Sequence, residues 1–117
     1  MAKLQTLLFM SETIEFYVDS ISIEGNICYV TGVCDRGSII LGSLFLEVYN
    51  YIRGKDSSGL TLTKGKEFIR GTKLRVQQIR AYRRTLSELP EGMSGELWLI
   101  AEEEIHLQPK ELLVGQS

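Results

Sequence analysis

Hydrophobic and polar residues alternate in short runs over most of the chain, a pattern typical of β-strands rather than helices. Between residues 14 and 23, the large apolar side chains fall first on even positions and then on odd positions. This change of parity near Asp19 and Ser20 predicts a bulge or bend within one strand. From Leu44 onward the alternation is regular and predicts two faces. Leu44, Leu46, Val48 and Ile52 are expected inside, and Phe45, Glu47, Tyr49 and Tyr51 outside.

Glycines interrupt these runs at Gly25, Gly32, Gly37 and Gly42. A glycine inside a strand marks a bulge, a barrel corner or a close approach of two backbones. Turn residues also recur at intervals of about 8–12 residues, which is typical of sandwiches and barrels. We therefore predict an all-β fold, a small Greek-key antiparallel β-barrel of about six to seven strands. Two segments compete as helices, AKLQTLLFM near the start and TLSEL at residues 85–89.

The 117 residues, of which 44% are hydrophobic, suffice for one domain with a packed core. We expect residues 1–12 to form an N-terminal extension and the polar, glycine-rich residues 53–67 to form an extended hairpin or loop. Cys28 and Cys34 lie about 20 Å apart on one predicted strand, too far for a disulfide. The apolar run at the start is short for a signal peptide, and no run reaches the roughly 18 residues of a membrane span. These features favour a cytoplasmic protein with reduced thiols.

Residues suited to catalysis are scarce in this sequence. His106 is the single histidine, and neither cysteine has a nearby cation or helix start to activate it. One histidine and two cysteines are also too few for a four-ligand zinc site. The segment TKGKE lacks the glycine spacing and the Ser or Thr of a phosphate-binding loop. We therefore expect no enzymatic activity, no cofactor, no metal and no bound nucleotide.

Charge is unevenly distributed, although the formal net charge is only −2. Residues 64–84 contain eight basic residues and one acidic residue, whereas residues 88–111 contain seven acidic residues and one lysine. The interpretation we favour is that the basic and acidic strands lie side by side and neutralise each other. The alternative is a basic nucleic-acid face with a stacking tyrosine. Its candidate RNA-binding residues are Lys73, Arg75, Arg80, Tyr82, Arg83 and Arg84.

Several glycine-containing segments follow a pattern found in a known family. They are Val30-Thr31-Gly32, Asp35-Arg36-Gly37 and Gly95-Glu96. With their flanking apolar strands, over about residues 16–114, they resemble the second domain of translational GTPases such as elongation factor Tu. The resemblance implies a stand-alone Greek-key barrel that lacks the GTPase domain and the third domain.

The resemblance also sets an expectation about partners. In the family, this barrel packs on the GTPase domain and helps to hold the aminoacyl end of transfer RNA. No RNA-contacting residue of the family can be matched onto this chain. Gln108 and Pro109 also stand where the family usually has an Arg-Gly pair. The resemblance therefore implies the fold more directly than the function.

Two functions remain open from the sequence. The first, which we favour, is a non-catalytic protein-binding barrel that serves as a regulatory, adaptor or immunity-type protein. Its partner surface is expected on the outward tyrosine ribbon and its return strand, because aromatic residues and arginine are typical of binding hot spots. The second is an RNA- or ribosome-associated barrel that uses the basic residues named above. The candidate protein-binding residues are Phe45, Tyr49, Tyr51, Phe68 and Arg70.

Overall fold

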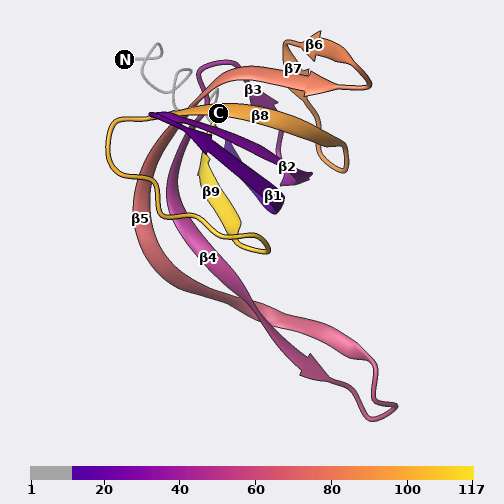
Figure 1. Cartoon of the computed structure of the whole chain (residues 1–117). Helices are drawn as coiled ribbons and strands as arrows, with labels where there is room; N and C mark the ends of the chain where they lie inside the picture. The colour runs from indigo at the N-terminus through magenta and orange to yellow at the C-terminus, as the bar shows by residue number, and fades with distance from the viewer. Residues whose placement is uncertain (1–11) are drawn as a thin grey trace, which may run out of the picture.

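The computed structural model describes residues 12–117, and every helix or strand assigned to them is a β-strand (Figure 1). The predicted N-terminal extension, residues 1–12, and the competing helix within it lie outside the described residues, except for Glu12. Within the described part, no helix is long and apolar enough to cross a membrane. The strands are β1 (Thr13–Glu24), β2 (Ile27–Arg36), β3 (Ile39–Ile40), β4 (Leu44–Lys55), β5 (Thr61–Ala81), β6 (Arg84–Leu86), β7 (Glu88–Leu89), β8 (Ser94–Ala101) and β9 (Leu112–Gln116).

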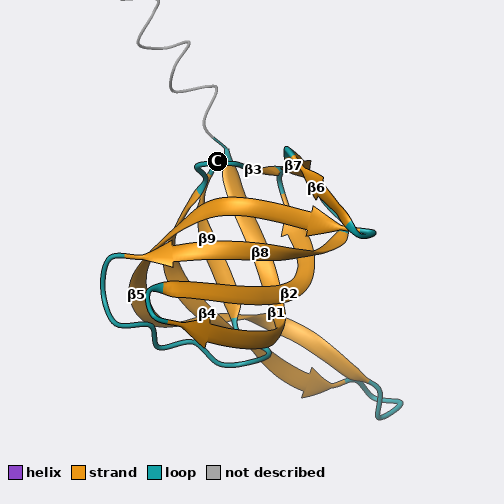
Figure 2. Cartoon of the chain, turned by 45° about the horizontal axis from the view of Figure 1, so that its top comes forward, coloured by secondary structure: helices purple, strands orange, loops and turns teal. Residues whose placement is uncertain are grey.

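Six of these strands close into a ring in the order β4–β9–β1–β2–β8–β5, and β5 returns to β4 (Figure 2). All pairings are antiparallel, β6 extends the sheet beyond β5, and β3 and β7 form a separate ribbon. The connections from β2 to β4 and from β8 to β9 each cross to the opposite side of the ring. The predicted all-β barrel is therefore confirmed.

Apolar side chains from all six strands of the ring fill its interior. On β1, Ile14, Phe16 and Val18 are fully buried, as their shared parity predicts. The register with β2 then shifts between Val18 and Ser20, which is the predicted bulge. Beyond it, the odd-numbered Ile21 packs against the core, as the change of parity predicts, whereas Ile23 near the end of β1 is 48% exposed.

The faces of β4 differ from the prediction. Phe45, expected outside, is 0% exposed, whereas Leu46, expected inside, is 40% exposed. The cause is a second bulge, because the register with β5 shifts between Phe45 and Glu47. Val48 is again buried, and Ile52 is exposed because it lies beyond the ring. Phe45 is thus a core residue, and its assignment to a partner surface is wrong.

The glycines and turns explain how the strands bend. A Cβ at Gly32 would overlap the carbonyl oxygen of Tyr17, so this glycine marks the predicted close approach of two backbones. Gly37 has a φ of 72° and turns the chain after β2, a conformation that glycine adopts without steric cost. The possible helical turn TLSEL is wrong, because Leu86 pairs with Ile79 of β5 in a hairpin. Strand pairing overrides a weak local preference for helix.

Strands β4 and β5 continue together beyond the ring as a projecting hairpin (Figure 1). We call residues 50–67 the hairpin arm. Strand β9 pairs with β4 only as far as Tyr49, and β8 pairs with β5 only from Leu74 onward. Both edges of the arm therefore lack a strand neighbour within the described residues.

Candidate functional site

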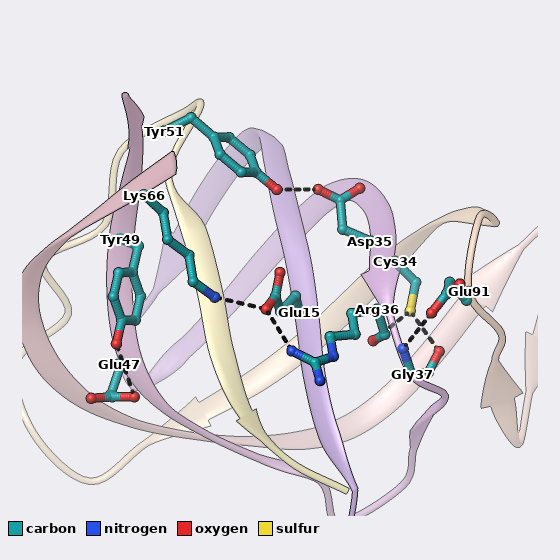
Figure 3. Close-up of polar contacts among 10 residues, drawn as sticks. All are labelled: Glu15, Cys34, Asp35, Arg36, Gly37, Glu47, Tyr49, Tyr51, Lys66 and Glu91. Atoms are coloured by element: carbon teal, nitrogen blue, oxygen red, sulfur yellow. Dashed lines mark hydrogen bonds and ion pairs between the residues drawn. The ribbon is translucent and has the colours of Figure 1, made fainter. Parts of the chain in front are cut away.

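A polar network fixes the base of the hairpin arm to the barrel wall (Figure 3). Lys66, on β5, donates a hydrogen bond of 2.8 Å to Oε2 of Glu15, on β1. Arg36, at the end of β2, lies 3.8 Å from the same oxygen. The Glu15 carboxylate is almost fully buried, so pairing with two cations offsets the cost of its burial. The network therefore orients the arm relative to two strands of the barrel, β1 and β2.

Tyr51 extends this network on the outer surface. Its hydroxyl donates to Oδ2 of Asp35 at 2.7 Å (Figure 3). Its ring centroid lies 5.7 Å from that of Tyr17. Burial, together with the hydrogen bond to Asp35, raises the pKa of Tyr51 well above its usual range. The hydroxyl therefore remains a proton donor at neutral pH. Arg53 also donates to the hydroxyl of Tyr17, at 3.4 Å.

Tyr49 and Phe68 face each other across β4 and β5. Their rings meet edge to face with centroids 5.6 Å apart, and the Lys66 ammonium lies 5.0 Å from the Tyr49 ring. The Tyr49 hydroxyl donates to Glu47 at 3.4 Å. Phe68 is exposed, whereas Tyr49 is half-buried. The structure thus brings Tyr49, Tyr51 and Phe68 of the predicted set to one region at the base of the arm.

Arg70, the remaining member of that set, is engaged inside the molecule. Its guanidinium donates to both carboxylate oxygens of Glu111, at 3.1 and 2.7 Å, and to the carbonyl oxygen of His106 at 2.6 Å. Glu111 is buried and also accepts from the backbone N–H of Gln108. This bidentate pair holds the connection between β8 and β9 against β5. We assign Arg70 a structural role on this geometry.

The arm also carries exposed aliphatic residues that the sequence analysis did not single out. Ile52 is 45% exposed and Leu60 is 67% exposed, and Leu62 is exposed as well. Gly54 is directly opposite Leu62, so Ile52 and Leu62 share one face of the hairpin. The alternation of Leu60 and Leu62 with threonines was the available signal. It was missed because this stretch was classified by its polar and glycine content.

The basic residues of β5 lie beside β8 and the glutamate that follows it, as predicted. Arg80 is directly opposite Glu96, and Lys73 forms an ion pair of 3.0 Å with Glu102. Neutralisation is nevertheless incomplete. The guanidinium carbon of Arg80 lies 5.9 Å from the centroid of the Trp98 ring. Arg75 donates a hydrogen bond of 3.1 Å to the carbonyl oxygen of Gly42. Among the described residues, no ion pair with a carboxylate forms at Arg75, Arg80, Arg83 and Arg84.

An open groove of about 670 Å³ is lined by two of these arginines, Arg80 and Arg83. Tyr82 and Arg83 form one wall, in a turn where their φ angles are 53° and 62°. Tyr82 is 78% exposed, which is unusual for so large a ring. Asp19 and Glu96 also line the groove, so its charge is mixed rather than purely basic.

The described residues offer little for catalysis. No cluster of three or more metal-ligating side chains occurs among them. Cys28 and Cys34 are buried free thiols, and burial raises the pKa of Cys28 to about 11 and raises that of Cys34 as well. His106 is exposed, with Nε2 at 3.6 Å from Oε2 of Glu104, whereas both thiols are buried. These groups form no nucleophile–base pair.

Comparison with known proteins identifies the class of fold. No protein-family model matches the chain, and no curated protein matches it. A solved structure does match: the apo form of translation elongation factor SelB from Methanococcus maripaludis, with a TM-score of 0.62 and 13% sequence identity. The match covers 97% of this chain and 24% of that chain, and it leaves the catalytic GTPase domain uncovered. The chain therefore has the fold of a translation-factor β-barrel domain, as the glycine segments predicted.

Proposed function

We propose that this chain is a non-catalytic protein-binding barrel that presents its hairpin arm to a partner protein. One observation carries the proposal: exposed aliphatic residues gather on an element that leaves the barrel. Ile52, Leu60 and Leu62 contribute nothing to the closed core, so their exposure lacks a structural reason. Contiguous exposed apolar residues on a projecting element are typical of interaction sites.

The base of the arm supports the same proposal. Tyr49 and Phe68 offer an aromatic pair on the opposite face of the hairpin, which they share with Arg53, and aromatic residues are enriched in binding hot spots. The contacts of Lys66 and Tyr51 with the barrel hold this region in place before binding. A preorganised surface loses less conformational entropy on association.

The test is quantitative capture of partner proteins by the tagged chain from extracts of its source cells. We expect the double substitution Ile52→Asn with Leu62→Asn to abolish capture at an unchanged melting temperature, because both side chains are exposed. Ile23→Asn is the matched control, since Ile23 is 48% exposed and lies on β1, outside the arm. Equal capture by all three proteins would contradict the proposal.

A second candidate function is RNA binding, favoured by the four arginines without carboxylate partners and by the exposed Tyr82 beside them. Arginines can contact phosphates while a tyrosine stacks on a base. If this function holds, affinity for single-stranded RNA should fall steeply with salt, with a log–log slope of about −0.7 for each phosphate contact. The double substitution Arg83→Ala with Arg84→Ala should flatten that slope. Capture of protein partners should be unaffected by the same substitutions.

A further inference from the structure

We infer that the hairpin arm binds an extended acidic segment of its partner, in which carboxylate and aliphatic side chains alternate and which pairs with the free edge of β4. This inference rests on the proposed function and specifies the partner's chemistry. Three observations support this chemistry: the charge of the arm, the alternation of residue types along β4, and the regular edge of β4 compared with the bulged edge of β5.

The outer part of the arm is basic on an acidic chain. Residues 53–64 contain Arg53, Lys55 and Lys64 but one acidic residue, Asp56, while the chain as a whole has a formal net charge of −2. Asp56 directs one carboxylate oxygen into its own turn, where it accepts from the backbone N–H groups of Ser58 and Leu60 at 2.9 and 3.0 Å. The three cations therefore give the outer part of the arm an excess of positive charge. This charge favours an acidic ligand.

Chemistry alternates regularly along the exposed end of β4. Ile52 and Gly54 lie on one face, and Arg53 and Lys55 lie on the other, because successive residues of a strand point to opposite sides. A strand added alongside would place its own alternate residues next to these two faces. Aliphatic residues would then meet Ile52, and carboxylates would meet Arg53 and Lys55.

The edge of β4 is better suited to strand addition than the edge of β5. Ile52 to Lys55 pairs only with β5, since β9 ends opposite Tyr49. On β5, the register shifts leave Lys64 and Ile69 as extra residues, so that edge is interrupted by bulges. Bulges hinder the pairing of a further strand, whereas a regular edge presents unpaired N–H and C=O groups to it.

Charge also argues against two other occupants. Two arms pairing through their β4 edges would bring Arg53 and Lys55 of one copy close to the same cations of the other, and like charges across strands are destabilising. The phosphates of RNA could pair with the cations of the arm, but RNA would leave Ile52 and Leu62 exposed to water. The acidic, alternating segment satisfies both faces of the arm at once.

The experiment uses two synthetic peptides and the isotopically labelled full chain. One peptide alternates glutamate and valine over eight residues, and the other has the same composition with four glutamates followed by four valines. We expect the alternating peptide to shift the amide signals of residues 52–55 and to bind at least about fivefold more tightly than the block peptide. Equal binding of the two peptides, or shifts mapped to the Tyr82 groove, would overturn the inference.

Charge reversal supplies a second readout. The variant Arg53→Glu with Lys55→Glu should bind the alternating glutamate–valine peptide at least about fivefold more weakly than the original chain does. The same variant should instead bind a peptide in which lysine and valine alternate. Arm-dependent self-association in sedimentation equilibrium, or RNA shifting the same amides, would also overturn the inference. If partner capture needs Ile52 and Leu62 but charge reversal has no effect, the inference fails while the proposed function stands. If the Ile52→Asn, Leu62→Asn variant captures partners as well as the original chain does, the proposed function itself fails.

Discussion

At Gly32, the approach of two backbones leaves no room for a side chain. Strand β2 passes the bulge of β1 there, and an added Cβ would overlap the carbonyl oxygen of Tyr17. We expect Gly32→Ala to lower the free energy of unfolding by about 3 kcal/mol, since neither backbone can move without disturbing the ladder. At Gly71, by contrast, a Cβ would meet the carbonyl oxygen of Leu46 at 3.8 Å, an ordinary contact.

Gly71→Ala is therefore the matched control for Gly32→Ala. It should change the free energy of unfolding by less than about 1 kcal/mol, because only unfolded-state entropy is affected. Chemical denaturation of both variants measures the difference. Equal stability of the two variants would mean that the strands can separate at Gly32 without loss.

The two thiols make a second prediction at the scale of single residues. Because burial raises the pKa of Cys28 from 9.0 to about 11, the native thiol stays protonated where an unfolded thiol would ionise. Ellman's reagent at pH 8 should therefore react slowly with the native chain and rapidly after denaturation. The raised pKa also makes the free energy of unfolding depend on pH. Below about pH 9 Cys28 is protonated in both states and stability is unaffected, and stability declines as pH rises from 9 toward 11 because the unfolded thiol ionises first. Rapid reaction of both thiols in the native state would show that the interior opens readily.

At the scale of single strands, register decides which side chains become core. The parity of β1 was readable from the sequence because its apolar residues change from even to odd positions at the bulge. On β4 the bulge at Leu46 has no such mark, since Leu44, Phe45 and Leu46 are all apolar. Sequence alternation predicts a face only where polar residues interrupt the apolar ones. The partners of Arg70 and Arg80 were unreadable for a related reason, because cross-strand neighbours depend on the register.

Two phenylalanines test this register directly. Phe45→Ala should cost about 3–5 kcal/mol, because it removes a fully buried ring from the core. Phe68→Ala is the control, since its ring is exposed and should cost within about 1 kcal/mol. Thermal and chemical unfolding of both variants checks the difference. If Phe68→Ala cost more unfolding free energy than Phe45→Ala, Phe45 would point outward, as simple alternation predicts.

At the scale of the whole molecule, β9 closes the ring because it pairs with β1 on one side and β4 on the other. It also buries Leu112, Leu113 and Val114, and a buried aliphatic side chain contributes about 1.5–3 kcal/mol. The sum is comparable with the whole stability of a small domain, about 5–15 kcal/mol. The arm differs in kind, since its residues from Gly54 to Leu62 are absent from the core cluster.

The comparison of two deletions separates these roles. Removing residues 112–117 should abolish the cooperative thermal transition, because the core opens and two strand edges lose their partners at once. Replacing the nine residues from Gly54 to Leu62 by Asn-Gly removes more of the chain. That variant should nevertheless unfold cooperatively within a few degrees of the intact protein, because a two-residue turn can rejoin Arg53 and Thr63, which already pair. Circular dichroism melts of both deletions give the answer. If excision of the arm also destroys the transition, the arm belongs to the folding unit, and its exposed aliphatic residues cannot be attributed to binding alone.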